Sequence, residues 1–289
     1  MVTRFDHAVI AVRDLDEAIR LYRRLGFEVD PGGRHTGLGT YNALIRFGLD
    51  YIELISIYDH AEVKASGPRG TTLQDLLEKH VGGLAAYALA TETIEQEAER
   101  FQQIGLDATG PFAMERLRPD GHLLQWRLLV PGGVSYRRPW PFIIQWNAPD
   151  EQRLTWDKPG NHPNGAVEWF SIDIAVHDLE SGLHLYKTQL GLDEVSHDSA
   201  EQRAQFRVGS STINLLAPGS IDLAQSTLTE LGEGPVTLYF AVKSIHQAYE
   251  VLEQRGIEAA LLPNGSLLLP MQETLGARIS LIELPLNLV

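Results

Sequence analysis

Apolar residues along the chain follow two periods, one typical of strands and one typical of helices. Residues 5–12 are almost continuously apolar, and after them apolar residues return every three or four positions over 15–25. This change of period predicts a strand followed by an amphipathic helix. Asp14 stands where a helix-capping side chain is expected, and Gly26 stands where the helix should end. Further apolar runs predict three strands after the helix, over 27–29, 41–47 and 50–55.

This β-α-β-β-β succession occurs four times in the sequence. The first and third copies are the most alike, with Ala-Val-Arg-Asp-Leu-Asp at 11–16 and Ala-Val-His-Asp-Leu-Glu at 175–180. In each copy a capping residue is followed 12 or 13 positions later by a glycine. The capping residues are Asp14, Thr93, Asp178 and Ser244, and the glycines are Gly26, Gly105, Gly191 and Gly256. The repeat predicts an α+β fold of tandem βαβββ modules, with four modules paired into two domains.

Turn-forming residues gather between the second and third modules. Residues 147–150 (Asn-Ala-Pro-Asp) and 159–165 (Pro-Gly-Asn-His-Pro-Asn-Gly) have the composition of a linker. We therefore expect one domain over residues 1–150 and a second over 165–289. Two further elements are expected between the repeated ones, a helix over 71–80 and an irregular loop over 33–40.

The composition narrows the class of protein. The chain has 289 residues, of which 44% are hydrophobic and 21% charged, as is ordinary for a globular protein. Without cysteine it has no disulfide framework, no thiolate metal site and no cysteine nucleophile. The 24 basic and 38 acidic residues give a net charge of −14, and no basic run is present. Nucleic acids and anionic membrane surfaces are therefore not expected as partners.

The location expected from these features is the cytoplasm. The absence of cysteine suits a reducing compartment. The first residues reach Arg4, Asp6 and His7 too early for a signal peptide. No apolar run approaches the roughly 20 residues that span a bilayer.

Two ionisable residues interrupt the apolar strands of the first module. His7 lies on the strand face that period-two alternation gives to Phe5 and Val9, and Glu53 lies in the last strand of the module. A carboxylate in so apolar a strand is costly unless a charge, a proton or a metal compensates it. The alternative is that Glu53 faces solvent on an edge strand and that His7 is a hydrogen-bonded core residue.

The repeat allows a comparison of these positions between modules. The aligned residues are Ala86, Ser171 and Thr237 opposite His7, and Gln145, Asn214 and Glu283 opposite Glu53. If His7, Glu53 and Gln145 converge, they offer one nitrogen and two oxygen ligands. Such a set suits Zn, Mn, Ni or Fe(II), with coordination positions left open for water and substrate.

The glycine-rich segment 31–42 contains two candidates for binding or catalysis, His35 and Asn42. Its Gly37-Leu38-Gly39 lacks the third glycine and the following helix of a dinucleotide site, which excludes that interpretation. As a lid or rim, the segment would bring His35 to a pocket as an acid or base, together with Asn42. The alternative is a flexible hairpin connection.

Residues 116–126 contain two arginines and a tryptophan of interest. Arg116 and Arg118 alternate onto one strand face, where a guanidinium can hold a substrate carboxylate or phosphate. A solvated strand face explains the same two residues without a function. Trp126 and Trp146 are expected in the core or in a pocket wall, rather than in a stacking platform for nucleic acid.

Taken together, these motifs resemble a known group of proteins. The four modules, with Asp-His-Ala-Val-Ile-Ala-Val at 6–12 and Tyr-Ile-Glu-Leu at 51–54, resemble the vicinal oxygen chelate superfamily. That superfamily includes glyoxalase I, bleomycin-resistance proteins and extradiol dioxygenases. Residues 5–146 are similar to its glyoxalase-like branch, through motifs at 31–35, 39–42, 118–121 and 141–146. Residues 167–285 share only the module pattern.

The resemblance implies two cup-shaped domains and a divalent metal held by side chains of the first and last strands. His7, Glu53 and Gln145 fall on three of the four usual ligand positions, and Ala86 occupies the fourth. The second domain lacks the usual ligands, so no metal is expected there.

Two functions remain open at this stage. The first is a metal-dependent enzyme of the isomerase, lyase or dioxygenase type, whose ion chelates adjacent oxygens of a small substrate. Its residues would be His7, Glu53 and Gln145 at the metal, His35 and Glu53 in catalysis, and Asn42, Arg116, Arg118, Trp126 and Trp146 at the substrate. The second is a protein of the bleomycin-resistance type that sequesters a small molecule without chemistry. A homodimer is compatible with either function.

Overall fold

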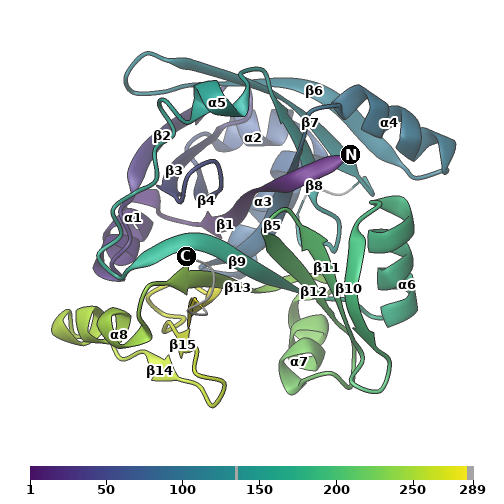
Figure 1. Cartoon of the computed structure of the whole chain (residues 1–289). Helices are drawn as coiled ribbons and strands as arrows, with labels where there is room; N and C mark the ends of the chain where they lie inside the picture. The colour runs from purple at the N-terminus through teal and green to yellow at the C-terminus, as the bar shows by residue number, and fades with distance from the viewer. Residues whose placement is uncertain (134–135, 285–289) are drawn as a thin grey trace.

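The computed structural model describes residues 1–133 and 136–284, and it contains two eight-stranded sheets (Figure 1). The first sheet closes into a barrel in the order β1-β4-β3-β2-β6-β7-β8-β5. Its strands are β1 (Val2–Val12), β2 (Asp30–His35), β3 (Thr40–Arg46), β4 (Tyr51–Ile57), β5 (Gly82–Thr91), β6 (Ala108–Leu117), β7 (Leu123–Pro131) and β8 (Phe142–Trp146). The first module supplies β1 to β4 and the second supplies β5 to β8. The two modules meet where β1 pairs with β5 and where β2 pairs with β6.

In the part of the chain that the structure describes, five helices accompany the first sheet. They are α1 (Leu15–Arg24), α2 (His60–Ala65), α3 (Pro68–Lys79), α4 (Ile94–Gln103) and α5 (Asp150–Arg153). Helix α3 corresponds to the helix expected over 71–80, whereas the preceding α2 had no signal in the periodicity. No helix in the described part of the chain is long and apolar enough to cross a membrane.

The capping pattern placed the repeated helices correctly, although one cap differs. The Asp14 carboxylate accepts a first-turn N–H of α1 at 2.9 Å, and Gly26 follows the helix with a positive φ of 85°. At α4 the Thr93 side chain makes no capping hydrogen bond. The N–H of Ile94 is donated instead to the side chain of Gln145 on β8, at 2.9 Å. This helix is therefore capped from a distant strand.

The segment after α1 differs from the expectation. Residues 27–29 are not a strand, and β2 covers part of the expected irregular loop over 33–40. Arg34 pairs with Leu117 of β6, so β2 closes the barrel between the two modules. Gly33 permits this approach, because a Cβ there would lie 2.5 Å from the carbonyl oxygen of Leu117. A strand that contains glycine instead of alternating apolar residues leaves no periodic signal.

The second sheet is open, in the order β10-β11-β12-β9-β13-β16-β15-β14. Its strands are β9 (Ala166–Ala175), β10 (Asp193–Asp198), β11 (Arg203–Val208), β12 (Ser211–Leu216), β13 (Gly234–Val242), β14 (Ala260–Leu261), β15 (Leu267–Leu268) and β16 (Arg278–Glu283). Its helices are α6 (Leu179–Leu183), which continues as a π-helical turn over His184–Gln189, α7 (Asp222–Leu231) and α8 (Ile245–Gln254). The predicted α+β fold of paired βαβββ modules is confirmed.

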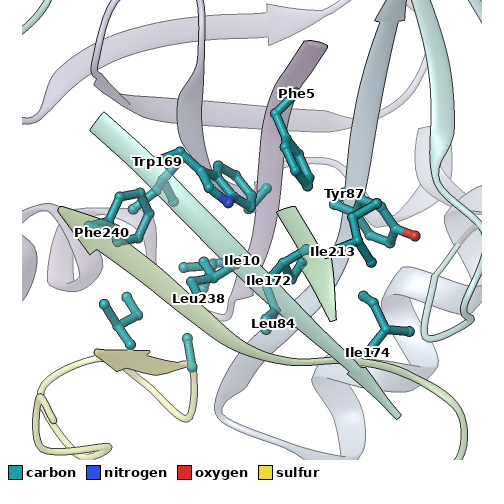
Figure 2. Close-up of a cluster of buried hydrophobic side chains, with 14 of the residues drawn as sticks. Phe5, Ile10, Leu84, Tyr87, Trp169, Ile172, Ile174, Ile213, Leu238 and Phe240 are labelled. Carbon is teal, nitrogen blue, oxygen red and sulfur yellow. The ribbon is translucent and has the colours of Figure 1, made fainter. Parts of the chain in front are cut away.

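One apolar core lies between the barrel and the second sheet (Figure 2). Phe5 of β1 stacks on Trp169 of β9 with ring centroids 4.7 Å apart, and Trp169 contacts Phe240 of β13 at 5.8 Å. On the same interface, the hydroxyl groups of Tyr87 and Tyr186 are hydrogen-bonded to each other. Because this shared surface is apolar and buried, its removal from water holds the second sheet against the barrel.

Candidate functional site

The barrel of the first domain encloses a cavity of about 90 Å³. By comparison, a single buried water needs about 10–15 Å³. The polar side of the wall includes His7, His35, Thr40, Tyr51, Glu53 and Arg116. The apolar side includes Met114, Trp126, Leu128, Phe142, Ile144 and Trp146. The volume of the cavity is well below the roughly 300–1,000 Å³ of pockets for drug-sized ligands. The cavity therefore suits a molecule of few heavy atoms with one polar end and one apolar end.

Glu53 on β4 is at the centre of the polar side. Its Oε1 accepts an N–H from Asn42 at 2.5 Å and lies 3.4 Å from Nε2 of His35, and its Oε2 lies 3.8 Å from Nε2 of His7. Burial raises the pKa of this carboxyl. The neighbouring His35, His7, Asn42 and Arg116 outweigh burial and hold the pKa below its ordinary value. At neutral pH, where the His35 ring is uncharged, the Asn42 hydrogen bond and the charge of Arg116 still favour the ionised form of Glu53.

His7 is oriented by the residue that precedes it. Its Nδ1 lies 2.8 Å from Oδ1 of Asp6, and Oδ2 of Asp6 accepts an N–H from Trp146 at 2.9 Å. Burial raises the pKa of Asp6, but the His7 hydrogen bond and the charges of Arg4 and Arg153 bring it well below the ordinary value. An ionised carboxylate only accepts hydrogen bonds, so Nδ1 of His7 is the donor. In the neutral ring, Nε2 then carries the lone pair on the side of Glu53.

A β-bulge at Asp6 makes this arrangement possible. In the pairing of β1 with β5 the register shifts between Phe5 and His7, so Asp6 has no partner residue across the strands. Such bulges re-aim side chains next to functional sites. Phe5 consequently packs in the core between the two sheets, whereas His7 lines the cavity. The expectation that Phe5 and His7 share a strand face is therefore wrong.

Asp6 is a site residue that sequence reasoning missed. Period-two alternation assigns it to the face opposite His7, away from any pocket. A signal was nevertheless present, because an acidic residue inside an apolar strand requires a compensating partner. The structure provides that partner in the adjacent imidazole and in Arg4, whose Nη1 donates to Asp6 at 3.0 Å.

His35 ends β2 and forms part of the cavity wall. Its Nδ1 lies 2.9 Å from Oγ1 of Thr40, and its ring meets Trp126 edge-on at 6.2 Å between centroids. Burial lowers the pKa of His35 to about 4, although the charge of Glu53 acts in the opposite direction. The ring is therefore neutral at pH 7. Its role as an acid or base stays a prediction, and the structure places it beside Glu53 in a barrel strand.

The structure separates the two candidate arginines. Arg116 on β6 is 3% exposed and lines the cavity, where its charge acts on Glu53. Arg118 lies beyond the end of β6, so strand alternation does not extend to it. Its guanidinium pairs with Asp120 at 3.0 Å and Asp157 at 3.4 Å, and it does not line the cavity. Arg116 alone is placed to contact a ligand in the cavity.

The remaining substrate-binding candidates are two tryptophans that line the cavity and an asparagine that lies behind its wall. Trp126 and Trp146 both line the apolar side, with ring centroids 5.2 Å apart. Asn42 is buried but does not line the cavity. It lies behind Glu53 and holds that carboxylate, so it is placed to orient a site residue instead of a substrate.

Gln145 does not meet His7 and Glu53, contrary to the expected ligand set. Along β8 the residues Phe142, Ile144 and Trp146 line the cavity, and Gln145 faces helix α4. Its Oε1 caps that helix, and its Nε2 donates to the carbonyl oxygen of Glu92 at 2.9 Å. The alternation of the strand, combined with this cap, directs the Gln145 amide away from the cavity.

The donors that remain do not fit a divalent metal site. Within residues 1–133 and 136–284, no group of three or more His, Cys, Asp or Glu side chains is arranged to hold a metal ion. Oε1 of Glu53 already accepts the Asn42 amide, and Arg116 adds positive charge near it. Ala86, at the fourth expected position, packs with the apolar side.

Comparison with known families identifies the class of protein. Residues 5–190 match the family model described as the Glyoxalase-like domain. The match covers more than half of the chain, and the chain belongs to this family. A comparison with curated proteins found no match.

Solved structures show the same two-domain fold. A hypothetical protein from Staphylococcus aureus has a TM-score of 0.70 and 16% identity, over 97% of this chain and 99% of that one. A mutant of 4-hydroxymandelate synthase from Streptomyces coelicolor has a TM-score of 0.65 and 14% identity, over 98% and 92%. A xylose isomerase-like TIM barrel/4-hydroxyphenylpyruvate dioxygenase fusion protein has a TM-score of 0.58 and 15% identity, over 100% of this chain and 50% of that one. Together with the family match, these likenesses in fold confirm the resemblance to the vicinal oxygen chelate superfamily.

Proposed function

We propose that this chain is an enzyme of the isomerase or lyase type that acts on a small oxygenated molecule in the barrel cavity. The observation that carries the proposal is the buried, ionised Glu53 carboxylate, which faces the cavity between His7 and His35. Ionisable groups held in such surroundings are concentrated at catalytic sites. The apolar opposite wall would hold the carbon part of the substrate.

The groups in the wall support a proton-transfer reaction. Glu53 would accept a proton from a carbon next to a carbonyl group, and the carbonyl oxygen would gain negative charge. Arg116, in the same wall, would stabilise that charge. Return of the proton to a neighbouring carbon completes an isomerisation, and departure of an adjacent leaving group completes an elimination. His7, oriented by Asp6, would supply or accept the second proton through Nε2.

The metal-dependent version of this function remains a prediction of the resemblance. It includes a dioxygenase type of reaction and an ion held by His7, Glu53 and Gln145. The position of Gln145, whose amide caps α4, gives that ligand set no support.

A second candidate function is sequestration of a small apolar molecule without chemistry. It is favoured by the second module, which contributes Phe142, Ile144 and other apolar side chains to the cavity and, among the described lining residues, no Asp, Glu, His or Lys. In that case Glu53 and its neighbours would serve only to recognise the polar end of the ligand.

Proton exchange distinguishes catalysis from sequestration. The wild-type chain, Glu53→Gln and the exposed control Glu258→Gln would each be incubated in D2O with a panel of 2-hydroxyaldehydes, 2-hydroxyketones and 2-oxo acids. Proton NMR follows loss of the C–H signal next to the carbonyl and formation of product. We expect exchange or conversion by wild type and by Glu258→Gln. In Glu53→Gln the rate should fall by about 100-fold or more.

The same samples test the alternative by thermal unfolding. A compound that raises the unfolding temperature of wild type and is recovered unchanged, with no deuterium, would support sequestration. Equal exchange rates in wild type and Glu53→Gln would contradict the proposed role of Glu53.

A further inference from the structure

A second concavity, of about 500 Å³, lies where the two domains meet. Its lining comes from the end of α3, the start of β5, helix α7, the start of β13 and the first residue of β16. Ligand pockets in proteins commonly have volumes of about 300–1,000 Å³. We call this concavity the interdomain groove. It is separate from the barrel cavity, with which it shares no lining residue.

The interdomain groove is positively charged in a strongly acidic chain. Among the described residues that line it, Lys79, Arg137 and Arg278 are basic and Glu230 is acidic. No described Asp or Glu oxygen lies within 4.0 Å of any of these three basic groups. With a net charge of −14, the chain has many carboxylates that could pair with them. Arg278 acts at longer range on the buried Asp173, and no such interaction is present for Lys79 and Arg137 among the described residues. The groove therefore leaves positive charge available to an anion.

Arg137 shows how this charge is built into the groove. Its guanidinium donates to the carbonyl oxygens of Leu84 at 3.2 Å, Gly232 at 3.3 Å and Pro235 at 2.5 Å, and so joins the two domains. Main-chain carbonyls satisfy N–H groups but do not neutralise the charge. The Nε atom is buried without a hydrogen-bond partner. Burial lowers the pKa of Arg137 to about 10, which leaves it charged at neutral pH.

Exposed apolar side chains border the same groove. Val81 is 57% exposed, Met271 43% and Leu231 37%, and all three belong to its lining. Single exposed apolar residues are ordinary, but a group of them around one concavity marks a binding surface.

The two domains meet closely at one edge of the groove. A Cβ at Gly82 would lie 2.8 Å from the carbonyl oxygen of Leu275, and a Cβ at Gly276 would lie 3.2 Å from the carbonyl oxygen of Gly82. Gly276 also has a positive φ of 87°. Because the backbones pack directly, without side chains between them, the groove has a rigid margin.

We propose that the interdomain groove binds a small amphipathic anion, with a carboxylate or phosphate head at Arg137, Arg278 and Lys79. The apolar body of the ligand lies along Val81, Leu231 and Met271. A guanidinium suits both kinds of head, because its paired N–H groups match two oxygens of one anion. Arg278 is the group placed for that contact, whereas Arg137, whose N–H groups are donated to main-chain carbonyls, acts through its charge. The apolar margin selects against inorganic ions, and the basic lining selects against neutral lipids.

Isothermal titration with three ligands of equal chain length tests the proposal. Decanoate and decyl phosphate provide the two kinds of head, and decanol provides the same apolar body without charge, all below the concentrations at which they aggregate. We expect one anion to bind per chain. Decanol should bind at least about tenfold more weakly than the anions, because its uncharged hydroxyl cannot form the charged hydrogen bonds. The tighter of the two anions identifies the head group.

Variants of the full-length chain locate the binding. Arg278→Met combined with Lys79→Met should weaken anion binding about tenfold or more, and Glu230→Gln should strengthen it by removing the acidic group. Lys243→Met, which removes an exposed lysine outside the groove, is the matched control. Leu231→Glu offers a second test at a partly exposed position that does not depend on the arginines. Glu53→Gln should bind the anion as wild type does, which separates this site from the barrel cavity.

Several outcomes would overturn the proposal. These are equal affinity for decanol and the anions, unchanged affinity in the double variant and in Leu231→Glu, or no binding at all. A dimer in sedimentation velocity that the anions do not dissociate and that Leu231→Glu abolishes would show instead that a second copy of the chain covers the groove.

Discussion

Nδ1 of His7 lies 2.8 Å from Oδ1 of Asp6, its neighbour in the same strand. Consecutive residues of a regular strand point to opposite faces, and the bulge at Asp6 removes that separation. Asp6 is fully buried and is held in turn by Arg4 and by Trp146 from the last barrel strand. The bulge in β1 thereby makes the orientation of the His7 imidazole depend on Trp146 of β8, the barrel strand that comes last in the sequence.

Replacement of Asp6 should destabilise the fold in a pH-dependent way. Asp6→Asn removes the buried carboxylate that His7, Arg4 and Arg153 share. Arg4 keeps Asp150 and Arg153 keeps Asp157, so the free energy of unfolding should fall by roughly 3 kcal/mol at pH 7, the low end for a broken buried ion pair. The pKa of Asp6 is lower in the folded chain than the ordinary value of about 3.9. Its stabilisation is therefore complete above that value and is lost as the pH falls below it. Urea unfolding at pH 7 and pH 3 should show the difference from wild type shrinking at pH 3.

Asp16→Asn, at an exposed position in α1, is the control for this measurement. It should change the free energy of unfolding much less than Asp6→Asn at pH 7. An Asp6→Asn chain as stable as wild type at both pH values would contradict the account of the buried carboxylate.

His35 should make the fold less stable as the pH falls from 7 towards 4. Burial lowers its pKa to about 4 in the folded chain, whereas the unfolded value is about 6.5. The unfolded chain therefore binds the proton first, and stability that is complete above about pH 6.5 declines below it, by about 3 kcal/mol at pH 4. Wild type and His35→Asn would be compared by urea unfolding across this range, with His246→Asn as the exposed control. If His35→Asn loses as much stability between pH 7 and pH 4 as wild type does, the account of a neutral, buried imidazole is contradicted.

Arg116 and Arg118 should differ sharply in their effect on ligands of the barrel cavity. Arg116 lines the cavity, and Arg118 is engaged by Asp120 and Asp157 outside it. Arg116→Met should weaken binding of a carbonyl compound, or lower its turnover, by about tenfold or more. Arg118→Met should leave both within about twofold. Titration of each variant with the best compound from the exchange panel measures the two affinities. Equal losses in Arg116→Met and Arg118→Met would argue against the assigned positions.

Gln145 should behave as a helix cap and not as a ligand. Gln145→Ala removes the acceptor for Ile94 N–H and should lower the free energy of unfolding by about 1 kcal/mol. Gln125→Ala, at an exposed position on the neighbouring strand, is the control. Elemental analysis after incubation with Zn, Mn, Ni or Fe(II) should give the same metal content for Gln145→Ala and wild type. A selective loss of bound metal in Gln145→Ala would restore the original ligand set.

Much of the candidate site was visible in the sequence. His7, His35, Glu53, Arg116, Trp126 and Trp146 were singled out there, and all of them line the cavity. Each is a polar or aromatic residue in an apolar strand or beside a glycine-rich turn. Such a residue differs from its sequence neighbours, so it can be recognised without knowledge of the fold. Gln145 and Arg118, two candidates that do not line the cavity as expected, were misplaced for a common reason. Gln145 and Arg118 depend on which face of a strand meets the barrel interior, and on where that strand ends.

The sequence by itself determined the modules, because helix caps, glycine stops and apolar periods act over a few residues. It also excluded cysteine chemistry outright. Only the tertiary structure decided that β2 closes a barrel, that the bulge turns Asp6 towards His7, and that Gln145 caps α4 instead of facing Glu53. It alone brought Arg137, Arg278 and Lys79 to one groove between the domains. These features rest on pairings between distant strands, and their energies depend on contacts that no local pattern of residues records.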